Sequence, residues 1–539
     1  MNVPLTGAAI ELPPWRRRIV IAAVMLATTL MALDSTIANV ALPHMRGSLS
    51  ATTDQIAWVV TGYIVASAIA TPLIGAVAAR IGRKTIFLTA IIAFSATSAM
   101  CGLSTSLGEL VFFRVLQGMS GAAFVPLSQS ILFDITPRER YGQGMAVFGL
   151  GVMGGPVLGP VLGGLLTDQF SWRWVFFINL PITAAAFTLC FIFLPGLPRD
   201  RSRRFDFFGF ALLSTALAAI QLMLDRGQSA DWLESREIVL ELVIGVVAFY
   251  MFLVHMFTSK SPYVSPEIFR DRNFSNGLMV SVAVGLVLYS GSTMMATFLQ
   301  ELRGFDVYEA GMLLAPRGVG TGIAMFTVGR LIARTDPRLL LFGGILVMAA
   351  SLHQMSTFTA QTPAIDIIVA GTCQGLGMGF VFVPISSMGF ATLPAALRTE
   401  ATGIHTLSRS LGGSIGVAVA AALLASKSEE SFALSLGDVS LYSEAWRRLG
   451  DGLFSLTDPR GLAVLRMMIA HNALESAYQA TFFVMAVAVL AAAPLVFLLK
   501  RPPPLGAAAP ASSAPAKAES PEPRTPEPVS PRVAPVPAR

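Results

Sequence analysis

Charged side chains are scarce in this sequence. Of its 539 residues only 13% are Asp, Glu, Lys or Arg, whereas 54% are hydrophobic, and the mean hydropathy is +0.66. Soluble domains carry roughly a quarter charged residues, so this chain lacks the polar side chains that a water-exposed exterior requires. A soluble enzyme or binding domain is therefore excluded, and most of the protein surface must face lipid.

Residues that build metal sites, disulfide frameworks or nucleotide sites are also few. The three cysteines, Cys101, Cys190 and Cys373, lie in apolar stretches without metal or disulfide spacing. The sequence has no phosphate-binding GxxxxGK[ST] motif and no nucleophile elbow. We therefore expect no cofactor, no metal and no ATP-driven step, which leaves an ion gradient as the energy source. The net charge of +6 does not indicate a nucleic-acid partner, because basic residues cluster beside helix ends.

Long apolar segments, by contrast, are abundant. Fourteen of them reach the about 20 residues that a membrane-spanning helix needs. This pattern predicts an all-α integral membrane protein in the lipid bilayer. The predicted spans are 18–43, 54–79, 84–103, 107–133, 142–166, 174–195, 207–224, 237–257, 274–299, 309–332, 338–358, 365–390, 400–425 and 472–499.

Basic residues gather in alternate loops between these spans. The loops near 80–84, 138–140, 199–204 and 330–338 hold most of them, and the intervening loops hold only scattered arginines. Such a bias marks the cytoplasmic side of a membrane protein. With an even number of spans, it predicts that both termini are cytoplasmic.

An internal repeat divides the chain into two halves. QGM at 117–119 and FVP at 124–126 recur as QGL at 374–376 and FVP at 382–384, with the glutamine 257 positions later. Repeats in the same orientation are typical of transporters whose two halves rock against each other. The predicted organisation is a cytoplasmic segment 1–17, a six-helix bundle 18–200, two inserted helices 201–265, a second six-helix bundle 266–500 with an outer loop at 426–471, and a disordered Pro-rich cytoplasmic tail 501–539.

Charged and polar residues inside the spans are the candidates for proton coupling. Asp34 lies about nine residues, or ~13 Å, from the outer end of the first span, and Arg114 lies at a similar depth in the fourth. A carboxylate at such a depth is costly and usually marks an ion or proton pathway. Because an arginine cannot release its proton, we expect Arg114 to pair with Asp34, and Gln117, one turn away, to add a polar contact. A structural tether between the helices is the alternative.

Two further motifs indicate moving parts. The fifth span is unusually rich in Gly and Pro, which permit close helix packing and bend the axis; its motif residues are Gly151, Gly155, Pro156, Gly159, Pro160, Gly163 and Gly164. The loop after the second span forms a basic turn that we expect to latch the two halves through the carboxylate of Asp134. The residues of this cytoplasmic gate are Arg80, Gly82, Arg83, Lys84 and Asp134. Orientation signalling alone would also explain the basic turn.

Several motifs in order resemble the major facilitator superfamily, specifically its fourteen-helix drug:proton antiporters. LDSTIANVALP at 33–43, RVLQG at 114–118, the glycine motif at 151–164 and WRWVFFINLP at 172–181 are similar to that family's motifs. The short stretch at 224–232 resembles the EmrB-type permease of tripartite multidrug exporters. Ala79 stands where the superfamily usually has an Asp, which puts a charge relay in the basic turn in doubt.

The resemblance implies a proton-coupled antiporter of the bacterial inner membrane that exports small hydrophobic or cationic compounds by alternating access. It also implies a periplasmic adaptor and an outer-membrane channel as partners. Adaptable apolar side chains are expected to line the substrate cavity, namely Phe148, Met153, Met294, Met295, Phe298 and Phe326. A dedicated exporter of one metabolite, siderophore or lipid-like molecule shares every motif. A non-transporting scaffold or sensor on this fold is the alternative of another class, although such a protein needs neither Asp34 nor Arg114.

Overall fold

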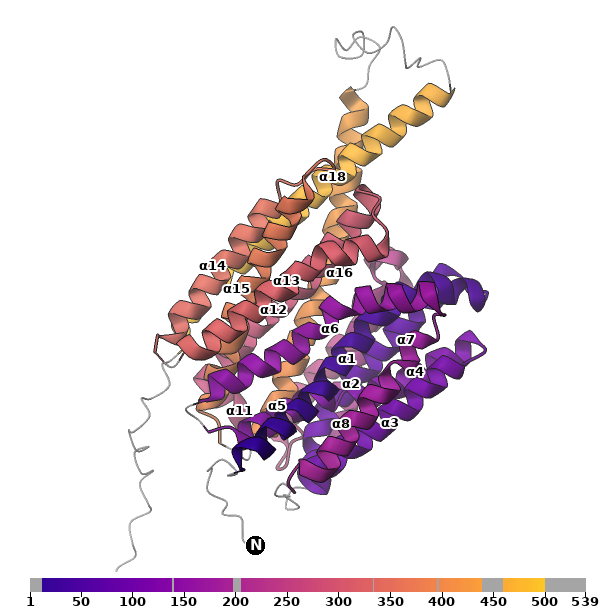
Figure 1. Cartoon of the computed structure of the whole chain (residues 1–539). Coiled ribbons are helices and arrows are strands. Elements are labelled where there is room, and N and C mark those ends of the chain that lie inside the picture. Colours follow the sequence, from indigo (N-terminus) through magenta and orange to yellow (C-terminus); the bar gives the residue numbers. More distant parts are fainter. Residues whose placement is uncertain are drawn as a thin grey trace, which may run out of the picture. The chain divides into compact units, whose positions relative to one another are not determined.

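A computed structural model describes residues 12–137, 140–196, 205–332, 334–394, 397–438 and 459–499. Thirteen of its helices or helix pairs are long and apolar enough to cross a membrane, and α6, with 29 residues, matches the remaining predicted span. The predicted multi-pass, all-α fold is confirmed (Figure 1). The predicted tail at 501–539 and most of the segment 1–17 lie outside the described residues.

The helices follow the predicted order. The N-terminal half holds α1 (Pro14–Ser48), α2 (Thr53–Ile81), α3 (Arg83–Leu103), α4 (Leu107–Gly121), α5 (Phe124–Ile135), α6 (Tyr141–Gln169), α7 (Trp174–Phe177) and α8 (Asn179–Phe193). Next come α9 (Phe207–Arg226), η2 (Gln228–Ala230), η3 (Trp232–Glu234) and α10 (Arg236–Thr258). The C-terminal half holds α11 (Glu267–Arg270), α12 (Arg272–Thr297), η4 (Phe298–Leu302), α13 (Val307–Leu331), α14 (Pro337–Met355), α15 (Ala364–Ala391), α16 (Arg398–Asp438), α18 (Pro459–Ala491) and α19 (Leu495–Leu498).

Helix starts follow from side chains that satisfy the first free N–H groups. Thr52 and Gln55 form a reciprocal capping box at the start of α2, each side chain accepting a hydrogen bond from the other's backbone N–H. Ser106, Asp271 and Asp306 accept in the same way at the starts of α4, α12 and α13. These caps fix where each span begins, and so the depth at which its polar side chains lie.

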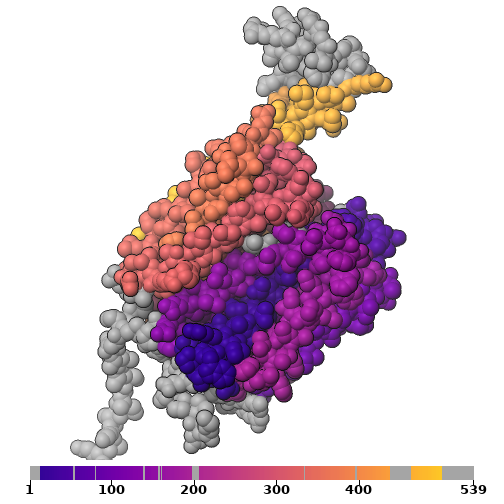
Figure 2. All heavy atoms as spheres, viewed as in Figure 1, coloured from indigo at the N-terminus to yellow at the C-terminus, as the bar shows by residue number. Residues whose placement is uncertain are grey.

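The two halves repeat the same helix packing. In the N-terminal half α1 packs on α6, α2 and α3 pack on α4, and α8 packs on α1 and α3. In the C-terminal half α12 packs on α16, α13 and α14 pack on α15, and α18 packs on α12 and α14. Between the halves, α6 packs on α13 and α2 packs on α16, and α9 contacts both α2 and α16. Figure 2 shows the side chains of the two halves meeting along a seam that follows α6 and α13.

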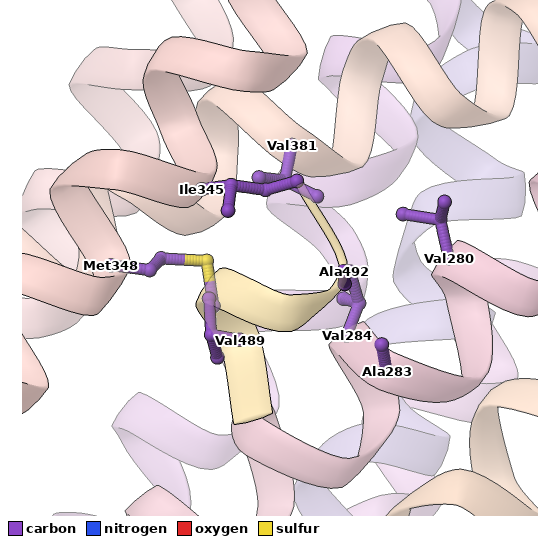
Figure 3. A pocket seen from close by; sticks show the side chains of 8 residues that line it. All are labelled: Val280, Ala283, Val284, Ile345, Met348, Val381, Val489 and Ala492. Atoms are coloured by element: carbon purple, nitrogen blue, oxygen red, sulfur yellow. The ribbon is translucent and has the colours of Figure 1, made fainter. Parts of the chain in front are cut away.

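One part of the interior of the C-terminal half is apolar. Valine, isoleucine, methionine and alanine side chains from α12, α14, α15 and α18 point into one small space, with Val284 opposite Val381 (Figure 3). No polar side chain lines this space, so it offers nothing that would hold a charged ligand.

The prediction of an outer loop at 426–471 is wrong for the first and the last part of that range. The helix α16 continues to Asp438 and α18 already begins at Pro459, so residues 426–438 and 459–471 are helical. With 41 residues, α16 is roughly 60 Å long and exceeds the ~30 Å hydrocarbon core. The charged residues of this stretch are unfavourable inside the bilayer, but they do not prevent helix formation. Its content of Ala, Leu, Ser and Glu is compatible with a helix. Residues 439–458 lie outside the described residues.

Candidate functional site

An ion pair is buried inside the N-terminal half. Arg114 on α4 donates from Nη1 to Oδ2 of Asp34 on α1 over 2.7 Å, and both side chains are 0% exposed. The structure thus brings together the two charged residues whose depths suggested a pair. In such a dry setting each charge depends on the other, because removing one leaves the second uncompensated.

Two amide side chains complete the hydrogen bonds to the carboxylate. Gln117 donates from Nε2 to Oδ1 of Asp34 over 3.1 Å, and its Oε1 accepts from Nη1 of Arg114 over 2.9 Å. Asn179, the first residue of α8, donates from Nδ2 to the same Oδ1 over 2.7 Å and to Oγ of Ser98 on α3 over 3.0 Å. Side chains from α1, α3, α4 and α8 therefore meet in one buried network.

Asn179 and Ser98 were not among the predicted site residues. The sequence did carry a signal for Asn179, since it is the only amide in the apolar stretch of α7 and α8. A buried amide is costly unless it is hydrogen-bonded. Such a residue indicates a partner elsewhere, but the sequence alone does not say which helix supplies it.

Aromatic rings and the backbone of α2 cover the arginine. The Cζ atom of Arg114 lies 4.2 Å from the centroid of the Tyr63 ring, and its Nε donates to the carbonyl of Val59 over 3.1 Å. Gly118 permits this approach, since a Cβ there would lie 2.3 Å from the carbonyl oxygen of Tyr63. Nη2 of Arg114 has no hydrogen-bond partner among the described residues. The network is dry and closely packed, and protonation of one carboxylate would remove its single negative charge.

The basic turn forms a second ion pair. Arg83, the first residue of α3, contacts the carboxylate of Asp134 at the end of α5 and donates to Oγ of Ser130 over 3.1 Å. Gly82 precedes it with φ +106°, a conformation that a side chain would disfavour. Lys84 instead donates to the carbonyls of Phe191 and Leu194, and Arg80 is exposed. Of the predicted gate residues, Arg83 and Asp134 form an ion pair and Gly82 precedes Arg83 in the chain, whereas Arg80 and Lys84 do not join the pair. The gating role stays a prediction.

The halves touch at the end of the bundle where α3 and α16 begin, which we call the basic end (Arg83, Lys84 and Arg398). Oγ of Ser130 lies 3.0 Å from Oγ1 of Thr399 on α16, next to the Arg83–Asp134 pair. Oγ1 of Thr402 donates to the carbonyl of Pro126 over 3.2 Å. The rings of Phe133 and Phe390 pack with centroids 5.1 Å apart. The described structure is therefore closed at the basic end.

The glycine motif of α6 lies mainly against α1, within one half. A Cβ on Gly155 would lie 2.2 Å from a backbone carbon of Ala32, and one on Gly159 would lie 2.1 Å from Oγ1 of Thr36. Gly151 and Gly163 also face α1, whereas Gly164 faces Tyr308 on α13 at 3.7 Å. The side chains of Pro156 and Pro160 lie outside the described residues.

The six predicted cavity residues do not gather in one place. Phe148 is buried and stacks on Phe382 of the other half, with centroids 6.2 Å apart. Phe298 is buried within the C-terminal half beside Tyr478. Met153, Met294 and Met295 are buried too, whereas Phe326 is 57% exposed on α13. A substrate cavity lined by these residues stays a prediction. Within the described residues, no group of three or more His, Cys, Asp or Glu gathers that would hold a metal.

Comparison with known proteins identifies the family. The model of the Major Facilitator Superfamily matches residues 24–417. The chain belongs to this superfamily. It is therefore a multi-pass membrane transporter, as its helices of spanning length also indicate, and not an enzyme.

Relatives within the superfamily cover most of the chain. The probable multidrug resistance protein EmrY of Escherichia coli (strain K12) is 36% identical over 77% of this chain and 80% of its own length. The multidrug export protein EmrB of the same organism is 35% identical over the same shares. The crystal structure of the human organic anion transporter MFSD10 covers 91% of this chain and 100% of its own, with a TM-score of 0.58 and 17% identity. At that identity the last likeness shows the fold alone.

Proposed function

We propose that this protein is a proton-coupled antiporter that exports small apolar or cationic compounds by alternating access. The observation that carries the proposal is the fully buried Asp34–Arg114 pair, a carboxylate inside a membrane span with its charge balanced by one cation. The similarity to EmrY and EmrB, which are named for multidrug resistance and multidrug export, supports a range of several substrates.

In this mechanism the proton binds at Oδ2 of Asp34. Neutralisation removes the ionic partner of Arg114 Nη1, which keeps its hydrogen bond to Oε1 of Gln117. The attraction between α1 and α4 then weakens. The contacts between the two halves at the basic end break, including the contact of Ser130 with Thr399. Substrate then enters at the opened basic end, where the proton is released, and the return of the substrate-loaded halves releases the substrate on the side from which the proton came.

The proposal includes the placement of the protein in its cell. Basic residues at the starts of α1, α3 and α16 favour a cytoplasmic basic end in a bacterial inner membrane, with both chain termini on that side. A periplasmic adaptor and an outer-membrane channel are the proposed partners. The proton gradient is the proposed energy source, without any bound cofactor.

Reconstituted protein tests this proposal. In proteoliposomes with an imposed pH gradient, the wild-type protein is expected to accumulate a lipophilic cationic dye or an apolar drug while protons move in the opposite direction. Asp34→Asn should abolish gradient-driven accumulation, because the amide cannot take up the proton. Asp231→Asn is the matched control, since Asp231 is exposed between η2 and η3 with φ +57°, which Asn tolerates. Accumulation by Asp34→Asn at the wild-type rate would contradict the proposal.

A further inference from the structure

The two helices between the halves, α9 and α10, lie against both of them, and we call them the inserted pair. α9 packs on α2 of the N-terminal half and on α16 of the C-terminal half, and α10 packs on α9. Leu213 and Leu217 of α9 share an apolar cluster with Leu407 of α16, and Ala76 of α2 packs against the same cluster. The inserted pair therefore lies beside two helices that contact each other across the halves.

A hydrogen bond fastens the inserted pair to the N-terminal half. Thr61 on α2 donates from Oγ1 to Oδ2 of Asp225, next to the last residue of α9. Nearer the basic end, α2 itself comes close to α16, since a Cβ on Gly75 would lie 3.4 Å from Cα of Glu400. Separation of the halves at the basic end must move α16 away from α2, and so away from a helix to which α9 is tied.

The segment 259–266, which follows α10, is fastened to the C-terminal half. The backbone N–H of Ser265 donates to Oε1 of Glu400, and Oγ of Ser265 donates to Oε2 over 3.2 Å. Glu400 lies in the first turn of α16, directly after Thr399, whose hydroxyl meets that of Ser130 in the other half. The carboxylate of Glu400 therefore holds the same helical turn that closes the basic end.

A second carboxylate joins this segment to the inserted pair. Oδ2 of Asp206, the residue before α9, accepts from the backbone N–H of Tyr263 over 3.0 Å and lies 2.8 Å from Nε2 of His255 on α10. Its Oδ1 caps α9 by accepting from the N–H of Gly209 over 2.9 Å. The start of α9, the end of α10 and the segment 259–266 thus meet at one side chain. A movement of Ser265 must displace the inserted pair or break these hydrogen bonds.

We propose that the inserted pair is a clamp that holds the basic end closed, and that Glu400 is the positioning residue through which it acts on α16. The clamp is tied to α2 through Asp225 and to α16 through Glu400, so it stabilises the state in which these two helices are together. This inference rests on the proposed alternating access, and it assigns to α9 and α10 a role in the closed state.

The exposure of Glu400 allows the clamp to be released. Hydrogen bonds to a carboxylate are stronger than those between neutral groups. Glu400 is partly exposed at the end of the bundle, so water can replace Ser265 as its donor when α16 moves, and no buried charge is left without a partner. The contact therefore favours the closed state without preventing the open one.

The accessibility of a buried cysteine tests the inference without substrate or gradient. Thr402 is 0% exposed, and its hydroxyl contacts the carbonyl of Pro126 in the other half. Thr402→Cys should therefore react with a water-soluble maleimide only when the basic end opens. Adding Glu400→Ala should raise this reaction rate roughly tenfold, as the loss of hydrogen bonds to a charged group provides. Protein without the added cysteine corrects for the three native ones.

Two further substitutions separate positioning from a general effect of the change. Glu400→Gln should react at nearly the wild-type rate, because its amide oxygen can accept from the N–H of Ser265 while its amide group donates to Oγ. Glu429→Ala is the matched control, since Glu429 is exposed on the same helix, and it should leave the rate unchanged. Melting temperatures show that each variant folds.

A variant at the other carboxylate tests whether the inserted pair acts as one clamp. Asp206→Asn keeps the cap on Gly209 but loses the acceptor for the N–H of Tyr263, and it should also speed the labelling of Thr402→Cys. Combined with Glu400→Ala it should add little, because residues that act through one network are not additive.

Three results would overturn the inference. One is an unchanged labelling rate in Glu400→Ala, and another is full additivity of Glu400→Ala with Asp206→Asn. The third is an equal rise in labelling of Ser351→Cys, a position 2% exposed inside the C-terminal half, because it would show general loosening instead of opening at the basic end. Since labelling needs neither substrate nor protons, these outcomes are independent of whether the protein is a proton-coupled exporter.

Discussion

At the scale of single residues, the proposed function depends on one carboxylate surrounded by donors. Asp34 accepts hydrogen bonds from Arg114, Gln117 and Asn179, and no part of it is exposed. The depth of Asp34 and Arg114 in their spans was enough to predict that they pair. The contribution of Asn179 was not predictable, because it depends on how α8 packs on α1 and α3. The sequence shows how deep a residue lies along its own helix. It does not show which residue of another helix lies opposite.

The mutual dependence of the two charges gives a prediction for stability. Arg114→Leu leaves the charge of Asp34 buried without its cation, and we expect a loss of about 3–5 kcal/mol in the free energy of unfolding. The double variant Asp34→Leu/Arg114→Leu removes both charges and should recover most of that loss. Denaturant titration in mixed micelles measures both. Equal destabilisation of the single and double variants would show that the pair does not act as a unit.

At the scale of helices, hydropathy predicted where spans lie but not what they touch. The predicted spans correspond to the long helices of the structure, because each needs only length and apolar content. The glycine motif of α6 was expected at a moving interface, yet most of its glycines contact α1 in the same half. The helical extensions of α16 and α18 were mistaken for a loop, since charge was interpreted as absence of structure.

The contact of α6 with α1 predicts which glycines tolerate a methyl group. Gly155→Ala would force a Cβ to 2.2 Å from the backbone of Ala32, and overpacking of this kind costs about 1–3 kcal/mol. Gly164→Ala on the same helix has its nearest neighbour at 3.7 Å and should change stability by no more than ~0.5 kcal/mol. Melting temperatures of the two variants provide the comparison. If Gly164→Ala were the more destabilised, the motif would serve the contact with α13 instead.

At the scale of the whole molecule, two halves with the same helix packing carry different polar networks. The N-terminal half holds the ion pair, whereas in the C-terminal half no carboxylate among the described residues pairs with Arg317, and Nε2 of Gln374 has no hydrogen-bond partner there. The repeat was visible in the sequence at Gln117 and Gln374, and the structure shows that it extends to the pattern of helix contacts. In the proposed mechanism, proton binding belongs to the N-terminal half.

The central claim is that the halves must separate at the basic end for protons and substrate to cross together. A cysteine pair tests it most directly, since the hydroxyls of Ser130 and Thr399 lie 3.0 Å apart across the two halves. In proteoliposomes, oxidation of Ser130→Cys/Thr399→Cys should stop both substrate accumulation and the opposing proton movement, and a reductant should restore both. The controls are the variants Ser130→Cys and Thr399→Cys, each of which adds one cysteine to the three native ones. If the cross-linked protein still transported substrate, or if protons continued to cross after transport had stopped, the account would be contradicted.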